Sequence, residues 1–226
     1  MGVCCRSLSF KACPRIGVDL RDTKATPKGP IRWGPTRLRG RWGSLLPMVS
    51  DAELYELAER VGQKLRAAVR HLVTAESCTG GWVSKALTDV SGSSQWYECG
   101  FVTYSNAAKV RDLGVSPGTL ARFGAVSEQT VREMAEGALR GSHANVALAV
   151  TGIAGPDGAS PGKPVGTVWF CAAARADTAI DIIAEEQFFD GDRAEVRSRS
   201  VQHALRLILR LDLPVRAEHP PRTQPA

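Results

Sequence analysis

The apolar residues of the chain occur in two patterns, one with helical spacing and one with short continuous runs. After Ser50, an apolar residue recurs every three or four positions over residues 54–65, which is the stripe of an amphipathic helix. Ser50 and Glu53 form the S-x-x-E box that begins such helices. The pattern predicts helices over residues 50–69, 78–90, 105–110, 127–141 and 192–213, and strands over 71–77, 96–104, 146–150, 165–174 and 179–189. Residues 117–118 are expected to lie in a loop.

The order of these elements indicates the fold class. Strands that alternate with helices and then end in a hairpin predict an α/β fold, a three-layer α/β/α sandwich with a mixed sheet. This domain is expected to span residues 48–213. Residues 1–47 are rich in Gly, Pro and Arg without a sustained apolar period, so we expect them to be disordered or to precede a true start at Met48. Residues 214–226 are polar and contain Pro, which predicts a disordered tail.

Charge is distributed unevenly along the chain. The whole sequence carries a formal net charge of +6 at neutral pH, which taken alone is typical of nucleic-acid-binding proteins. Residues 1–47 hold ten Lys and Arg and two Asp, a net charge of +8, so the rest of the chain carries −2. We therefore expect no nucleic-acid partner for the domain.

The apolar runs and the cysteines exclude other classes of protein. No apolar run reaches the roughly 18 residues that a membrane span needs, so no membrane association is expected. The six Cys form no C-x-x-C pair, and the four His are far apart in the sequence. This usage is typical of a reduced, cytoplasmic protein, and it predicts an activity that needs no metal or other cofactor.

A strand-to-helix junction at residues 74–81 (TAESCTGG) is the leading candidate for a functional site. Ser77 ends a buried strand at the carboxyl edge of the sheet, where α/β folds place their ligands. The free amides of a helix's first turn stabilise an anion, and Gly80 and Gly81 allow the backbone to approach a ligand closely. A serine beside amide donors is the minimum equipment for acyl transfer. The same octet also fits a plain helix cap, and by itself it leaves both interpretations open.

A nucleophilic serine needs a general base, and the histidines are poorly placed to provide one. His71 begins the strand that Ser77 ends, roughly 20 Å away, and His143 precedes another strand at the same distant edge. Lysine is the other established partner of serine. Lys109 lies in the first turn of a helix that follows a strand end, where the helix dipole should lower its pKa toward that of a base. A surface lysine is the alternative interpretation.

Two further features lie at strand ends. Tyr104 closes the strand before Lys109. Its phenol is placed either to relay a proton or to form a hydrogen bond with Ser77, and the alternative interpretation is an aromatic residue at a strand end with a solvent-exposed hydroxyl. The glycine-rich segment 151–158 (TGIAGPDG) follows a third strand. Its composition fits either a phosphate-binding loop or plain turns.

Six motifs along residues 50–212 are together similar to those of one family. In order they are TAESCTGG (74–81), GFVTYSNxxK (100–109), GAVSE (124–128), GIAGPDG (152–158), KPVGTVW (163–169) and FxGDR (189–193). This set, in this order, resembles the CinA C-terminal-domain family. The resemblance implies an α/β/α sandwich, a homodimer, and a nicotinamide-nucleotide amidase that hydrolyses nicotinamide mononucleotide to nicotinate mononucleotide and ammonia. Many members carry this unit behind a larger nucleotide-hydrolysing domain, whose activity is not expected here.

The resemblance also implies roles for individual residues. Ser77 is the nucleophile of an acyl-enzyme mechanism, with Lys109 and Tyr104 as its proton-handling partners. The residues expected to stabilise the oxyanion or bind the substrate are Thr79, Gly80, Gly81, Asn106, Thr151, Gly152, Gly155 and Lys163. The expected partner is thus a small-molecule nucleotide. Because some members are linked to competence or have no demonstrated amidase activity, a non-catalytic nucleotide-binding regulatory module is the alternative, and hydrolysis of another amide is a third possibility.

Overall fold

The computed structural model describes residues 48–175 and 180–213. These residues form one five-stranded mixed sheet, with the strands in the order β2-β1-β3-β4-β5. The strands are β1 (Leu72–Glu76), β2 (Tyr97–Val102), β3 (Val146–Gly152), β4 (Thr167–Arg175) and β5 (Ile180–Phe188). β1 pairs in parallel with β2 and β3, whereas β4 is antiparallel to both β3 and β5. The predictions for residues 1–47 and 214–226 lie outside the described residues.

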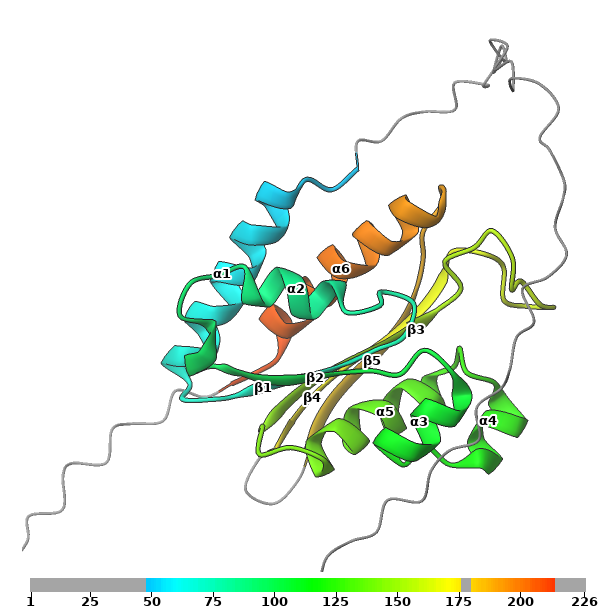
Figure 1. The fold of residues 1–226 in the computed structure, drawn as a ribbon, viewed down its shortest axis with the longest axis horizontal. Coiled ribbons are helices and arrows are strands. Elements are labelled where there is room, and N and C mark those ends of the chain that lie inside the picture. Colours follow the sequence, from blue (N-terminus) through cyan, green and yellow to red (C-terminus); the bar gives the residue numbers. More distant parts are fainter. Residues whose placement is uncertain (1–47, 176–179, 214–226) are drawn as a thin grey trace, which may run out of the picture. The chain divides into compact units, whose positions relative to one another are not determined.

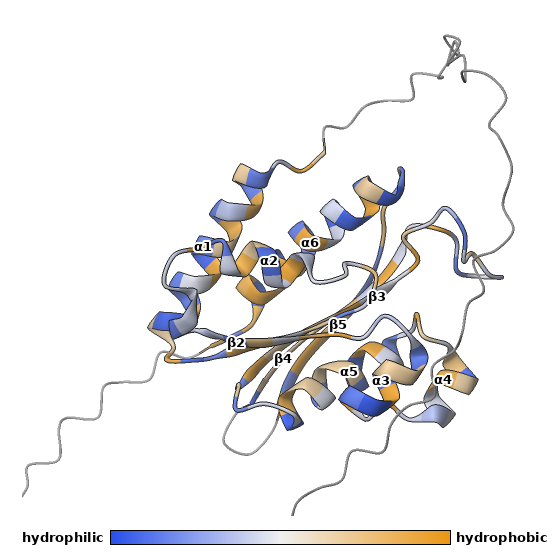
Figure 2. Ribbon diagram, in the orientation of Figure 1, coloured by the Kyte–Doolittle hydropathy of each residue, from blue (hydrophilic) through white to orange (hydrophobic). Residues whose placement is uncertain are grey.

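Helices cover both faces of this sheet (Figure 1). On one face lie α1 (Asp51–Ala67), α2 (Trp82–Thr88) and α6 (Arg193–Arg210), and on the other lie α3 (Asn106–Leu113), α4 (Pro117–Phe123) and α5 (Glu128–Arg140). Each face has its own apolar core. Figure 2 shows hydrophobic residues along the strands and hydrophilic residues on parts of every layer of helices. The predicted three-layer α/β/α sandwich with a mixed sheet is confirmed.

The central strands are covered on both sides. Every residue of β1 is buried, and so are the first six residues of β3. This explains why β3 reads as a continuous apolar run rather than as an alternation, whereas β1 also buries the polar residues Thr74 and Glu76. None of the helices in the described residues is long and apolar enough to cross a membrane.

The sequence placed most helix starts correctly because their capping residues are local. The Ser50 hydroxyl accepts from the amide of Glu53, and the Glu53 carboxylate accepts from the amide of Ser50. A second capping box forms between Asp192 and Glu195 at the start of α6. The expected loop at residues 117–118 is wrong, since α4 begins there. Pro117 occupies the first turn of that helix, where a missing amide hydrogen costs nothing, and Ser116 caps it.

The topology brings three strand ends to one edge of the sheet. β1 lies between its parallel neighbours β2 and β3, so the carboxyl ends of all three strands meet at this edge. The chain leaves β1 for β2 on one side and reaches β3 on the other, which makes β1 the strand at which the strand order reverses. Open α/β sheets form their ligand crevices at this kind of position.

Candidate active site

A cavity of about 240 Å³ lies at this edge of the sheet. Its walls come from the segments that follow the three strand ends and from the start of α6. Ser77 and Cys78 follow β1, and Tyr104, Asn106 and Lys109 follow β2. Thr151 and Gly152 end β3 and lead into the loop up to Gly158, and Ala125 and Val126 before α5 complete the wall. Segments far apart in the sequence therefore form one concave site.

Ser77 and Lys109 are in direct contact at this cavity. Lys109 Nζ lies 2.9 Å from Ser77 Oγ and donates a 2.7 Å hydrogen bond to the carbonyl of Thr103. Both side chains are deeply enclosed, because only 1% of Lys109 and 8% of Ser77 is exposed. Lys109 lies one turn into α3, and helical side chains lean toward the N-terminus of their helix, which directs this one back toward the strand ends.

Burial lowers the pKa of Lys109 from its ordinary value of 10.5 to about 8. Desolvation is thus the main cause, whereas the sequence argument had invoked the helix dipole. Within the described residues, Lys109 pairs with no carboxylate that would hold the proton in place. A neutral amine suits these two neighbours, since it donates an N–H to Thr103 and accepts the Ser77 hydroxyl proton on its lone pair. Lys109 is therefore equipped to act as a general base.

The buried amine predicts a measurable stability effect for Lys109→Met. The folded-state pKa lies below the unfolded-state value, so the cost of burying the ammonium is fully present below about pH 8 and disappears as the pH rises toward 10.5. After allowance for the lost hydrogen bonds, the substitution should raise the free energy of unfolding by about 2 kcal/mol at pH 7. Thermal melting should show a Tm about 5 °C higher than wild type at pH 7. The difference in Tm between the variant and the wild type should disappear between pH 8 and 10.5. A lower Tm for the variant at pH 7 would contradict this account.

The turn after Ser77 exposes fewer amides than the sequence suggested. Both Gly80 and Gly81 have the positive φ angles that glycine favours, 63° and 92°. However, the Gly80 amide donates to the Ser77 carbonyl, and the Gly81 amide donates to the Glu76 carboxylate. Each of these two amides thus already has an acceptor, and the binding of substrate by Gly80 and Gly81 stays a prediction. Among the described residues, the amides of this turn without an acceptor in another residue are those of Cys78 and Thr79.

Tyr104 reaches the cavity together with a residue that the sequence analysis did not select. Tyr104 is 61% exposed, and its hydroxyl accepts a 2.7 Å hydrogen bond from Arg193 Nη2. Arg193 also donates to the carbonyl of Gly155 at 2.8 Å, and it lines the cavity. Arg193 thus brings a permanent positive charge to a site otherwise built from β1, β2 and β3. The available signal was the FxGDR motif, which ends at Arg193.

The other predicted binding residues fall into two groups. Asn106, Thr151, Gly152 and Gly155 line the cavity. Lys163 does not line it, because its Nζ donates a 2.7 Å hydrogen bond to the carbonyl of Phe123 and lies in a separate hollow beside the start of α5. The structure therefore separates Lys163 from the Ser77 site.

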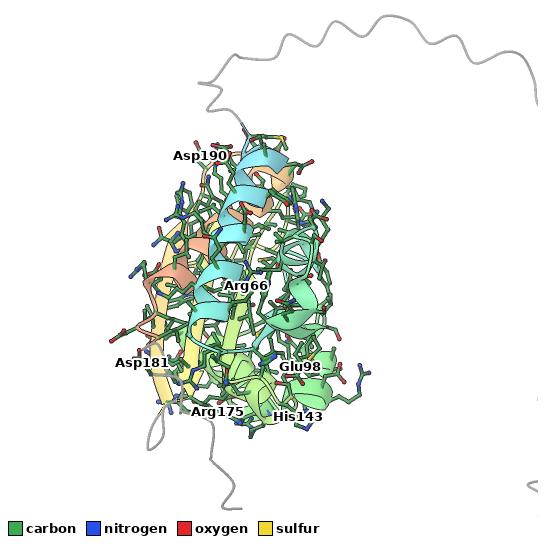
Figure 3. All side chains as sticks on the ribbon, turned by 90° about the vertical axis from the view of Figure 1, so that its left-hand side faces the viewer. Arg66, Glu98, His143, Arg175, Asp181 and Asp190 are labelled. Atoms are coloured by element: carbon green, nitrogen blue, oxygen red, sulfur yellow. The ribbon has the colours of Figure 1, made fainter. Side chains whose placement is uncertain are left out.

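The remaining nucleophiles and titratable groups do not compete with this pair. Burial raises the pKa of the Cys78 thiol to about 12, so its reactive thiolate form is absent at neutral pH. His143 lies beside Glu98 at the end of the molecule opposite Asp190 (Figure 3), which agrees with the distant edge expected for it. Across residues 48–175 and 180–213, no three His, Cys, Asp or Glu side chains gather as metal ligands would.

Comparison with known proteins places this arrangement in a family. Residues 54–211 match the family model of the CinA C-terminal domain. The chain belongs to this family. The resemblance to this family is confirmed over most of the described residues. It extends to individual proteins with curated names and to solved structures of competence/damage-inducible and CinA superfamily proteins.

Two curated relatives carry the same functional name. The nicotinamide-nucleotide amidohydrolase PncC of Escherichia coli K12 is 52% identical to this CinA C-terminal domain protein over 161 residues, which cover 71% of this chain and 95% of the relative. The protein of that name in Pseudomonas putida is 50% identical over 155 residues, covering 69% and 94%. The crystal structure of the competence/damage inducible protein CihA from Agrobacterium tumefaciens matches with a TM-score of 0.66 and 44% identity, covering 72% of this chain and 96% of that one.

Proposed function

We propose that this protein is a nicotinamide-nucleotide amidohydrolase that converts nicotinamide mononucleotide and water to nicotinate mononucleotide and ammonia. Two relatives with 50% and 52% identity over about 70% of this chain are named nicotinamide-nucleotide amidohydrolase. The observation that carries the proposal is the 2.9 Å contact between Ser77 Oγ and the buried Lys109 amine at the cavity. A nucleophile in contact with a base of lowered pKa is the arrangement that amide hydrolysis by acyl transfer requires.

The first half of the reaction forms an acyl-enzyme. Lys109 accepts the hydroxyl proton while Ser77 Oγ attacks the carboxamide carbon, and the carbonyl oxygen becomes an oxyanion. The amides of Cys78 and Thr79 are the donors of the turn that remain to stabilise it. Lys109, now an ammonium, returns its proton to the departing nitrogen, so that ammonia leaves and the acyl group stays on Ser77.

The second half repeats these steps with water. Lys109 removes a proton from the water molecule, which attacks the acyl carbon, and then returns that proton to Ser77 Oγ as the ester bond breaks. The acid formed in this step loses its proton to solvent to give nicotinate mononucleotide as a carboxylate, and Ser77 and Lys109 are restored. Lys109 accepts and returns the transferred proton in both halves of the reaction, so the mechanism needs no histidine.

Arg193 is the residue of the cavity that we expect to bind the phosphate group of the nucleotide. A guanidinium forms charge-assisted hydrogen bonds with phosphate oxygens, and Arg193 is held beside the cavity by Tyr104 and Gly155. Asn106 and the segment from Thr151 to Gly158 line the remaining wall, where they meet the ribose and the ring. In this arrangement Tyr104 orients Arg193, and its participation in proton transfer stays a prediction.

A non-catalytic nucleotide-binding module is the second candidate, since the similar protein from Agrobacterium tumefaciens is named a competence/damage inducible protein rather than an enzyme. The two functions differ in whether ammonia is released. A module would bind nicotinamide mononucleotide and leave it intact.

Ammonia release from a matched set of amides tests the proposal. The purified full-length chain is incubated with nicotinamide mononucleotide, nicotinamide riboside and nicotinamide, and ammonia and the acid product are measured. We expect equal amounts of ammonia and nicotinate mononucleotide. The riboside should show a kcat/KM about 100-fold lower, because it lacks the phosphate and its charge-assisted hydrogen bonds. Binding of the mononucleotide without ammonia would favour the module, and faster hydrolysis of the riboside or of nicotinamide would contradict the proposed substrate.

A further inference from the structure

Glu76 is a buried carboxylate directly beside the nucleophile. It is the last residue of β1, it is 1% exposed, and both of its oxygens accept hydrogen bonds from the start of α2. Oε2 accepts from the amides of Gly81 and Val83 at 3.0 Å each, and Oε1 accepts from the amide and hydroxyl of Ser84 at 2.8 and 2.6 Å. Within the described residues it has no cationic partner, so the helix amides stabilise its charge.

Arg197 binds the carbonyl groups of the same turn, the segment of residues 77–81. It extends from α6, and its Nε and Nη2 donate to two successive carbonyls, Cys78 O at 3.1 Å and Thr79 O at 2.8 Å. Its guanidinium lies over the ring of Trp82, 5.4 Å from the ring centroid. The planar fork of arginine suits two fixed acceptors and the flat ring at once.

These contacts fix the direction of the amides that remain free. In a trans peptide unit the carbonyl and the N–H point in opposite directions. The hydrogen bond from Arg197 to the Cys78 carbonyl therefore turns the Thr79 N–H away from Arg197. The hydrogen bond from Arg197 to the Thr79 carbonyl fixes the peptide unit between Thr79 and Gly80. The Gly80 N–H of that unit donates to Ser77 O at 3.1 Å. Glu76 accepts from the amides of Gly81, Val83 and Ser84, whereas the Trp82 amide donates to the Thr79 carbonyl.

We propose that Glu76 and Arg197 are positioning residues that hold the turn of residues 77–81 so that the Cys78 and Thr79 amides serve as the oxyanion donors. This inference rests on the proposed acyl transfer at Ser77. Neither side chain lines the cavity or contacts Ser77 Oγ or Lys109 Nζ, so both act through the backbone of the turn. Glu76 accepts hydrogen bonds from the amides at the end of the turn, and Arg197 donates hydrogen bonds to its carbonyls.

Arg197→Met tests the carbonyl side, because methionine keeps most of the side-chain length and the contact with Trp82 but donates no hydrogen bond. Displacing or losing an oxyanion donor costs about 10²-fold in turnover, so kcat should fall by about that factor. KM should change less than about threefold. The rise of activity with pH should keep its midpoint, because the Ser77–Lys109 contact is untouched. Arg206→Met, an exposed arginine on the same helix, is the matched control and should keep wild-type kcat.

Two comparisons separate positioning from general stability. Arg197→Lys keeps the charge but replaces the fork with a single donor group, so it should recover about tenfold of the lost kcat. Glu76→Gln leaves one acceptor oxygen where the carboxylate has two, so it should lower both Tm and kcat while the pH midpoint stays unchanged. A wild-type kcat in Arg197→Met or in folded Glu76→Gln would overturn the role of that residue, as would an equal loss in the Lys and Met variants of Arg197.

Labelling with phenylmethylsulfonyl fluoride measures the turn independently of the substrate. Ser77 Oγ attacks the sulfur, fluoride leaves, Lys109 takes the proton, and the same amide donors face the sulfonyl oxygens. Mass spectrometry should find the label on wild-type Ser77, with an initial rate about 10²-fold lower in Arg197→Met. Equal labelling rates and equal kcat in the two proteins would overturn the positioning role while the proposed function stands. Labelled wild type that releases no ammonia would overturn the proposed function, and the labelling rates alone then decide the positioning role. An unlabelled wild-type Ser77 without ammonia release would overturn both.

Discussion

Replacing Ser77 with alanine is expected to lower kcat for ammonia release to the detection limit, a loss of about 10⁵-fold or more, because the nucleophile and its base act as a unit. Removing the hydroxyl leaves Lys109 with nothing to activate. Binding should persist, since in the proposed complex the nucleotide is held mainly by Arg193 and by the other residues that line the cavity. The Kd of nicotinamide mononucleotide, measured by calorimetry, should change less than about threefold.

The control for this variant is Ser91→Ala, an exposed serine between α2 and β2 that should keep wild-type kcat and Kd. A mechanism in which an activated water attacks the amide directly would leave substantial turnover in Ser77→Ala. Ammonia release within about tenfold of wild type would therefore rule out Ser77 as the nucleophile. A Kd raised by more than about tenfold would instead assign the hydroxyl a role in binding.

The sequence predicted the fold well where the signals are local. The apolar run of β3, the capping boxes of α1 and α6, and the hairpin strands β4 and β5 all follow from residues close together in the chain. The start of α4 was missed because Pro117 and Gly118 were read as loop residues, although proline is favoured in the first turn of a helix.

The site was predictable only in part, because long-range contacts complete it. Ser77 and Lys109 each follow a strand end, and parallel strands bring those ends to one edge whatever the details of packing. Arg193 and Arg197 come from α6, whose contacts with Tyr104 and Cys78 span 89 and 119 residues. No pattern within one helix reveals which distant loop its arginines reach.

The assignment of the turn amides shows the same limit. From the sequence, a glycine pair at a helix start predicts free amides. The structure shows that the carboxylate of Glu76, five residues before Gly81, already binds that helix start. A buried acid that caps its own next helix is a feature of the three-dimensional packing, and the sequence shows only its place in the octet.

Lys109→Arg should reduce kcat by about 10³-fold or more although the positive charge is kept. The guanidinium stays protonated at any working pH, so it offers no lone pair for the Ser77 proton. In the proposed mechanism the neutral amine of Lys109 is the active form. The kcat/KM of the wild type should therefore rise with pH as Lys109 loses its proton, with a midpoint near its lowered pKa of about 8 rather than near 10.5.

The matched control is Lys85→Arg, because Lys85 is exposed on α2 and pairs with Asp89 at 2.6 Å through a contact that arginine reproduces. It should keep the wild-type kcat and pH profile. If Lys109→Arg instead retains turnover within about threefold of wild type, Lys109 supplies only a positive charge near the oxyanion. The proton must then pass to Tyr104, whose hydroxyl belongs to the same cavity, and Tyr104→Phe should become the variant that abolishes ammonia release.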